Sequence, residues 1–342
     1  MIKVFTFRQY VTEENRKIIF PLLLDLCFYE SSPLHNFYTI CENIDSADIV
    51  IIPIDINFFF RNKSVKELNN MIDYSRRLEK IVWVYTRGDF GKTIGQPVYT
   101  FRLGGFNSKM DDQTFTVPAL IQDPYSHFLK EEFQTLEKGK EPNVGFVGHS
   151  NSSGIKLLKE FVVYLQTNIK RIVSNDFDYQ PFFASGKFRH KILRDLEQTS
   201  LINTNFIHRK RYRAGAKTRE ERELTTLEFY KNIKNNPYTI CIRGVGNFSV
   251  RLYEVLAMGR IPVIVKTDNK LPLHWLNWEK HCIIVERGAI KEEIVNFHNS
   301  LNPLEFIEVQ KSNKKFWKDK LTREGYFIEI YDYFKKTVFN EI

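Results

Sequence analysis

The chain has 342 residues, of which 43% are hydrophobic and 27% charged, and its formal net charge is +9. Its 29 phenylalanines and 16 tyrosines supply ample core material, which excludes an intrinsically disordered chain. The length is enough for two domains. The positive charge favours an anionic partner, such as a nucleotide, an acidic glycan, a nucleic acid or a membrane surface.

No apolar run reaches the roughly 18 residues that a membrane-spanning helix needs, and the N-terminal MIKVFTF lacks the apolar core of a signal peptide. The four cysteines are far apart and form no C-x-x-C pair, so we expect neither a zinc site nor a disulfide framework. We therefore predict a cytoplasmic protein, whose basic charge favours peripheral contact with a membrane surface.

The first part of the chain alternates short β-rich runs with helical patterns. The apolar runs at 47–53 and 81–85 are typical of strands buried on both faces, so we expect a parallel sheet covered by helices. The predicted elements are strands at 2–7, 47–53, 81–85 and in VYTFRL, with helices at 13–29 and 65–78.

The polar stretch LEKGKEP (136–142) is the best linker candidate, because the same alternation restarts after it. The later elements are strands at 143–148, near LINTNFI, and at 238–242, 261–265 and 282–285, with helices at about 155–165 and 218–234. We predict three parts: an N-terminal Rossmann-like acceptor domain (1–138), a C-terminal nucleotide-sugar-binding domain (142–320), and a C-terminal helix (321–342) that packs back on the first domain.

The segment YTICIRGVGNFSVRLYEVLAMG runs from a strand through a glycine loop into a helix. Gly244 and Gly246 allow a tight turn and let a ligand approach the backbone amides. Ser249 or Asn247 is expected to cap the helix. The free N–H groups and positive dipole at the helix start form a ready site for phosphate oxygens.

Two arginines and a glutamate complete this segment. The guanidinium groups of Arg243 and Arg251 suit phosphate better than ammonium groups do. Glu254 shares a helix face with Arg251 and can accept hydrogen bonds from ribose hydroxyls. The segment therefore predicts a cradle for a nucleoside diphosphate. The plainer interpretation is a helix start with a surface Arg–Glu pair.

The same segment resembles the C-terminal motif of exostosin-type glycosyltransferases, R-G-x-x-x-x-S-x-R-x-x-E-A-L-x-x-G-x-I-P-V. The resemblance is strongest over 235–290, and ADIVIIP and LPLHWLNWEKHCIIV resemble further parts of that family. The residues that fall in register are Arg243, Gly244, Ser249, Arg251, Glu254, Leu256, Gly259, Ile261, Pro262 and Val263.

This resemblance implies an α/β fold of the GT-B type, with two Rossmann-like domains facing across a cleft and a helical C-terminal tail. It also implies inverting sugar transfer from a UDP- or GDP-sugar, with no obligatory metal or other cofactor. The acceptor, a glycan or lipid-linked saccharide, is not inherited from the family. Because the membrane anchor and cysteine-rich stem of eukaryotic members are missing, we expect a bacterial or viral cytosolic relative. The implied donor-binding residues are Arg243, Gly244, Asn247, Phe248, Ser249, Arg251 and Glu254, with Gly148, His149 and Ser150 from the loop after residue 147.

Inverting transfer needs a general base near the acceptor, at the carboxyl end of an N-terminal strand. Asp55 and Asp89 each follow a predicted strand, and His127 is a third candidate with weaker placement. A helix-capping or loop aspartate is the ordinary alternative for either carboxylate.

Two other functions stay open. Asp176 and Asp178 form the D-x-D pattern with which GT-A transferases hold a divalent metal, although this triplet is common. The basic run RKRYRAGAKTREERE (209–223) is compatible with a non-catalytic polyanion-binding protein. Such a run is more often a solvated loop and helix face, so we do not predict a nucleic-acid partner.

Overall fold

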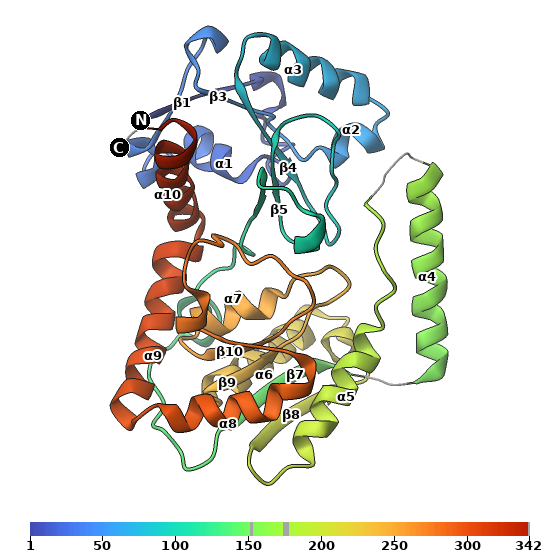
Figure 1. The fold of residues 1–342 in the computed structure, drawn as a ribbon, viewed down its shortest axis with the longest axis vertical. Coiled ribbons are helices and arrows are strands. Elements are labelled where there is room, and N and C mark those ends of the chain that lie inside the picture. Colours follow the sequence, from blue (N-terminus) through green and yellow to red (C-terminus); the bar gives the residue numbers. More distant parts are fainter. Residues whose placement is uncertain (151–152, 174–177, 341–342) are drawn as a thin grey trace.

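The computed structural model describes residues 1–150, 153–173 and 178–340, and within these ranges the chain forms two α/β domains (Figure 1). In the first, the described strands form one parallel sheet in the order β2-β1-β3-β4-β5-β6. Strand β3 is fully buried, as the continuous apolar run predicts. The strands are β1 (Ile2–Thr6), β2 (Tyr38–Ile40), β3 (Ile49–Ile51), β4 (Ile81–Thr86), β5 (Tyr99–Arg102) and β6 (Thr114–Thr116).

The helices of this domain are α1 (Pro21–Phe28), α2 (Asn57–Arg61) and α3 (Val65–Arg77). The prediction of one helix over 13–29 is wrong, because the helix begins only at Pro21. Proline has no N–H to donate and fixes its φ, so it suits the first helical position and holds the preceding Phe20 in a non-helical conformation. Ahead of it the chain makes turns and a bridge between Ile19 and Ile54.

The second domain is built on a parallel sheet with the order β11-β10-β9-β7-β8 among the described residues. Its strands are β7 (Asn143–His149), β8 (Asn203–Arg209), β9 (Tyr238–Cys241), β10 (Ile261–Val265) and β11 (Ile283–Val285). Its helices are α4 (Gly154–Val173), α5 (Ser185–Glu197), α6 (Arg219–Asn235), α7 (Val250–Ala257), α8 (Ile290–Ser300) and α9 (Pro303–Phe316).

The C-terminal segment returns to the first domain, where α10 (Arg323–Tyr333) lies beside α1 (Figure 1). The Tyr38 hydroxyl donates a 2.7 Å hydrogen bond to the Phe327 carbonyl, and Arg323 pairs with the buried Asp25. The Phe334 ring lies 4.7 Å from Trp83 under the first sheet. The tail therefore ties the two domains together.

The interface between the domains is polar around the loop after β9. Asn247 Nδ2 donates to the Gly105 carbonyl at 3.0 Å, and Ser108 Oγ bonds Asp268. A single buried apolar cluster contains residues of both domains, including Trp83 and Leu252. Two Rossmann-like sheets facing one another, with a helical tail, form the GT-B architecture, so the predicted fold is confirmed.

Candidate functional site

A cavity of about 1180 Å³ lies between the two domains. Its walls come from the segments that follow β4, β6, β7 and β9, so it opens where the carboxyl ends of both parallel sheets meet. Open α/β sheets bind their ligands at this edge. The volume exceeds the roughly 300–1,000 Å³ of ordinary small-molecule pockets, which leaves room for two substrates together.

The glycine loop after β9 borders this cavity as the sequence predicts. A Cβ at Gly244 would meet nothing within 4 Å, so the backbone there is accessible to a ligand. At Gly246 a Cβ would collide with the backbone of Asp89 from the other domain, so this glycine permits close domain contact. Phe248 and Ser249 also line the cavity.

Neither Ser249 nor Asn247 forms the side-chain cap that the sequence predicts at the start of α7. Ser249 occupies the N-cap position, but its side chain makes no capping hydrogen bond. Asn247 is buried and accepts from Thr267 Oγ1 at 2.8 Å while it donates across the domain interface. The Asn247 side chain therefore joins the domains, outside the cavity wall, and the N–H groups at the start of α7 receive no side-chain cap from Ser249.

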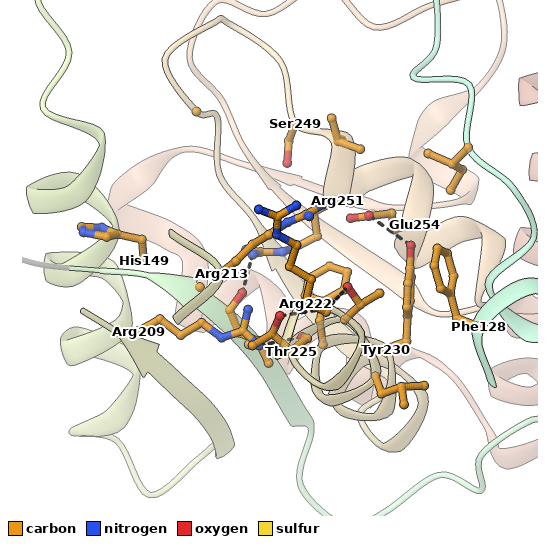
Figure 2. A pocket seen from close by; sticks show the side chains of 18 of the residues that line it. Phe128, His149, Arg209, Arg213, Arg222, Thr225, Tyr230, Ser249, Arg251 and Glu254 are labelled. Atoms are coloured by element: carbon orange, nitrogen blue, oxygen red, sulfur yellow. Dashed lines mark hydrogen bonds between the residues drawn. The ribbon is translucent and has the colours of Figure 1, made fainter. Parts of the chain in front are cut away.

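Arg251 and Glu254 lie on the first turns of α7 and both line the cavity (Figure 2). The Arg251 guanidinium donates to the carbonyls of Val147 at 2.6 Å and Ile240 at 3.3 Å, at the ends of β7 and β9. Its Nε is buried and has no hydrogen-bond partner among the described residues. Burial lowers the pKa of Arg251, because removal from water disfavours its charge.

Glu254 accepts a 3.3 Å hydrogen bond from the hydroxyl of Tyr230, which Figure 2 draws as a dashed line. Burial raises the pKa of Glu254, and the nearby Arg251 charge opposes that rise. The Tyr230 ring stacks on Phe128 with centroids 4.8 Å apart, and Phe128 lines the cavity from the segment that follows β6. A carboxylate and a half-buried aromatic ring of the cavity lining, that of Phe128, thus lie next to each other.

Two further arginines lie near the loop. Arg189 of α5 lines the cavity and donates to the His149 carbonyl at 2.9 Å, and its buried Nε has no hydrogen-bond partner within the described part of the chain. Arg243 lies behind the cavity wall, with its guanidinium 4.4 Å from the ring centroid of Phe183. Burial lowers the pKa of each arginine to about 10. No carboxylate in the described part of the chain forms an ion pair with Arg189, Arg243 or Arg251.

The basic run at 209–223 contributes more to the cavity than the sequence suggests. Figure 2 shows Arg209, Arg213 and Arg222 among the side chains around it. Over the described residues the lining includes six arginines against three carboxylates, Asp89, Glu223 and Glu254, so it has an excess of positive charge. The density of arginines was the available signal, but the sequence does not reveal that the run faces the cleft. The lining arginines are Arg189, Arg209, Arg213, Arg219, Arg222 and Arg251.

The three candidate bases occupy different environments. Asp89 is exposed and lines the cavity from the N-terminal domain, and His127 lines it as well. Asp55 is 1% exposed and does not line it. The Asp55 carboxylate accepts from the backbone N–H groups of Asn57 and Arg87, both at 3.1 Å, so it stabilises the loops after β3 and β4.

The three predicted residues of the loop after β7 also occupy different environments. Gly148 and His149 line the cavity, and a Cβ at Gly148 would lie 3.0 Å from Arg251 Nη2, so the glycine makes room for that arginine. Ser150 is buried outside the cavity wall, where its Oγ bonds His208 Nδ1. His208 Nε2 in turn lies 2.8 Å from a Glu197 carboxylate oxygen, so Ser150 belongs to a separate polar chain.

The D-x-D pattern lies partly outside the described residues, since Asp176 falls there. The Asp178 carboxylate accepts from Thr93 Oγ1 at 2.8 Å and lies 3.8 Å from Arg102. It therefore links the second domain to the first. Across the described ranges, no three histidine, cysteine or acidic side chains gather as ligands for a metal ion.

No protein-family model matches this sequence, and no curated protein matches it significantly. Among solved structures, TarM is similar with a TM-score of 0.30 and 12% sequence identity, over 73% of this chain and 54% of TarM. This chain thus spans about half the length of TarM.

Proposed function

We propose that this protein is a glycosyltransferase of the exostosin type, which moves a sugar with inversion from a UDP- or GDP-sugar to a saccharide acceptor. The observation that carries the proposal is the pair of half-buried guanidiniums, Arg189 and Arg251, which line the cavity and form no direct ion pair with a carboxylate among the described residues. A charge that is partly removed from water and lacks a direct ion-pair partner is unfavourable, so an anion bound beside these arginines would stabilise the site. The diphosphate of a nucleotide sugar supplies that anion.

Each part of the donor has a matching group. The start of α7 offers backbone N–H groups, and Arg251 keeps unused N–H donors beyond the two that bond carbonyls. Glu254 would accept from the ribose hydroxyls, and Phe128 would pack against the base. This arrangement binds the diphosphate through protein cations and dipoles, with no obligatory metal or other cofactor.

The chemical step follows from these positions. The acceptor hydroxyl oxygen attacks the anomeric carbon while the bond from that carbon to the diphosphate oxygen breaks, so the configuration inverts. Asp89 takes the hydroxyl proton as general base. The arginines stabilise the negative charge that develops on the departing diphosphate.

Calorimetric titration tests the donor site. UDP and GDP are titrated separately into the protein in EDTA, with uridine and guanosine as controls that lack phosphate. We expect one diphosphate to bind with micromolar affinity and its nucleoside to bind at least tenfold more weakly, because charge-assisted contacts to the phosphates dominate.

Two variants locate the site. Glu254→Ala should weaken binding by at least about tenfold through loss of the ribose contacts. Glu279→Ala removes an exposed glutamate outside the cavity and should bind as the wild type does. Loss of binding in EDTA, restored by Mg²⁺ or Mn²⁺, would favour the metal-dependent alternative with Asp178. Failure of both diphosphates to bind, together with salt-sensitive binding of heparin, would favour a polyanion-binding protein.

A further inference from the structure

Helix α4 lies at the edge of the molecule, outside the helices that cover the two sheets (Figure 1). Its inner face contacts the segment that follows it through Tyr164 and Asn168, and the first domain through Arg171. The Tyr164 ring lies 5.5 Å from Phe182, Asn168 bonds a backbone carbonyl of the following segment at 3.2 Å, and the Arg171 guanidinium lies 5.0 Å from the Phe90 ring. These residues are four and three positions apart, so they occupy one side of the helix.

A second face of α4, about a third of a turn around the helix from the first, is apolar and open to solvent. Its side chains recur at intervals of four and three residues, which places them in one stripe along the helix. They are between 42% and 64% exposed, whereas soluble proteins rarely leave a contiguous apolar stripe uncovered. The stripe consists of Leu158, Val162, Leu165, Ile169 and Ile172.

The charges of α4 have one dominant sign. Its sequence contains Lys156, Lys159, Lys170 and Arg171 against the single acidic residue Glu160. Lys159 and Lys170 are exposed and eleven positions apart (170 − 159 = 11), about three helical turns, so both lie on one flank of the apolar stripe. Two exposed aromatic residues, Tyr179 and Phe182, follow the helix.

We propose that α4 docks the protein on the surface of an anionic phospholipid bilayer, with the apolar stripe among the acyl chains and the lysines at the headgroups. An amphipathic helix with lysines beside its apolar face has the composition of interfacial helices. Among the described residues no helix is long and apolar enough to cross a membrane, so the contact is peripheral. The proposal does not depend on the proposed sugar transfer.

Charge decides between a bilayer and a second copy of the chain. Pairing of two α4 helices along their stripes would bring two positively charged helices together, which is unfavourable. An anionic surface instead attracts the same lysines. The bilayer is therefore the occupant that the charges favour.

Vesicle flotation of the full chain tests this surface. Vesicles of phosphatidylcholine alone are compared with vesicles of phosphatidylcholine and phosphatidylglycerol in equal parts. The wild type should float with the anionic vesicles only, and less so at high salt. Ile169→Ser should weaken binding by roughly tenfold, because a large apolar side chain no longer enters the bilayer.

Matched control variants test whether binding depends on α4 itself or on any exposed apolar or basic side chain of the protein. Leu304→Ser removes a side chain that is 75% exposed on α9, and Lys66→Glu reverses an exposed charge on α3. Leu304→Ser should bind as the wild type does, whereas Lys159→Glu should bind more weakly than Lys66→Glu. Unchanged melting temperatures would show that the variants are folded.

Three outcomes would overturn the proposal. The first is no flotation of the wild type, and the second is equal flotation of Ile169→Ser and Leu304→Ser. The third is a dimer in sedimentation velocity that Ile169→Ser dissociates, without vesicle binding, since it would assign the stripe to self-association.

Discussion

The contact between Gly246 and the Asp89 loop yields the sharpest structural prediction. A methyl group at Gly246 would lie 2.8 Å from Phe248 Cε1 and 2.9 Å from the Asp89 carbonyl carbon, and closer still to the Asp89 carbonyl oxygen. Carbon atoms in contact normally sit about 3.5–4.0 Å apart, so the domains or the loop must separate by roughly 0.6–1.2 Å. We expect Gly246→Ala to destabilise the protein by about 1–3 kcal/mol, as other overpacked sites do.

Urea denaturation followed by tryptophan fluorescence measures this change, with Gly244→Ala as the control in the same loop. A Cβ at Gly244 meets nothing within 4 Å, so that variant should unfold at or near the wild-type midpoint. A displacement near 1 Å at a catalytic cleft can also reduce turnover by about a hundredfold. Equal urea midpoints for the two alanine variants would refute the close domain contact.

Two further predictions concern the carboxylates of the cavity. Asp89→Asn should lower kcat by about 10²–10⁴-fold and leave the affinity for the nucleotide unchanged. If His127→Gln lowers kcat more than Asp89→Asn does, the general base is His127 and not Asp89. Burial raises the Glu254 pKa above its ordinary 4.5, so above the raised value the folded protein carries an unfavourable buried charge. Glu254→Gln should therefore be more stable than the wild type at neutral pH, and the gain in urea midpoint should shrink as the pH falls through the raised pKa. A wild type more stable than the Gln variant at neutral pH would contradict this reasoning.

Local patterns predicted most of the fold. The buried strands β3, β4 and β10 follow from continuous apolar runs, and the break at Gly139 and Pro142 marks where the second sheet begins. The start of α1 differs from the predicted helix over 13–29, because Pro21 suits the first position of a helix and the chain ahead of it forms turns. These features depend on neighbours in sequence.

The composition of the site was harder to predict because it depends on distant residues. Arg189 enters the cavity only because α5 packs beside β8, and its hydrogen bonds reach His149 and Arg243, which are 40 and 54 positions away. Asn247 has the residue type of a helix cap, yet its partner is Gly105, 142 positions earlier. The sequence motif predicts the loop and α7. That other arginines surround them follows only from the fold, which brings distant segments to the same cavity.

The central claim is that the cavity holds the diphosphate and ribose of a sugar nucleotide. The most direct measurement is a crystal structure with UDP or GDP, whichever binds, grown in EDTA. We predict the diphosphate within hydrogen-bond distance of the first N–H groups of α7 and of Arg251, with the ribose hydroxyls on Glu254. A nucleotide bound away from α7, or phosphates reached only through a metal ion on Asp178, would contradict the account.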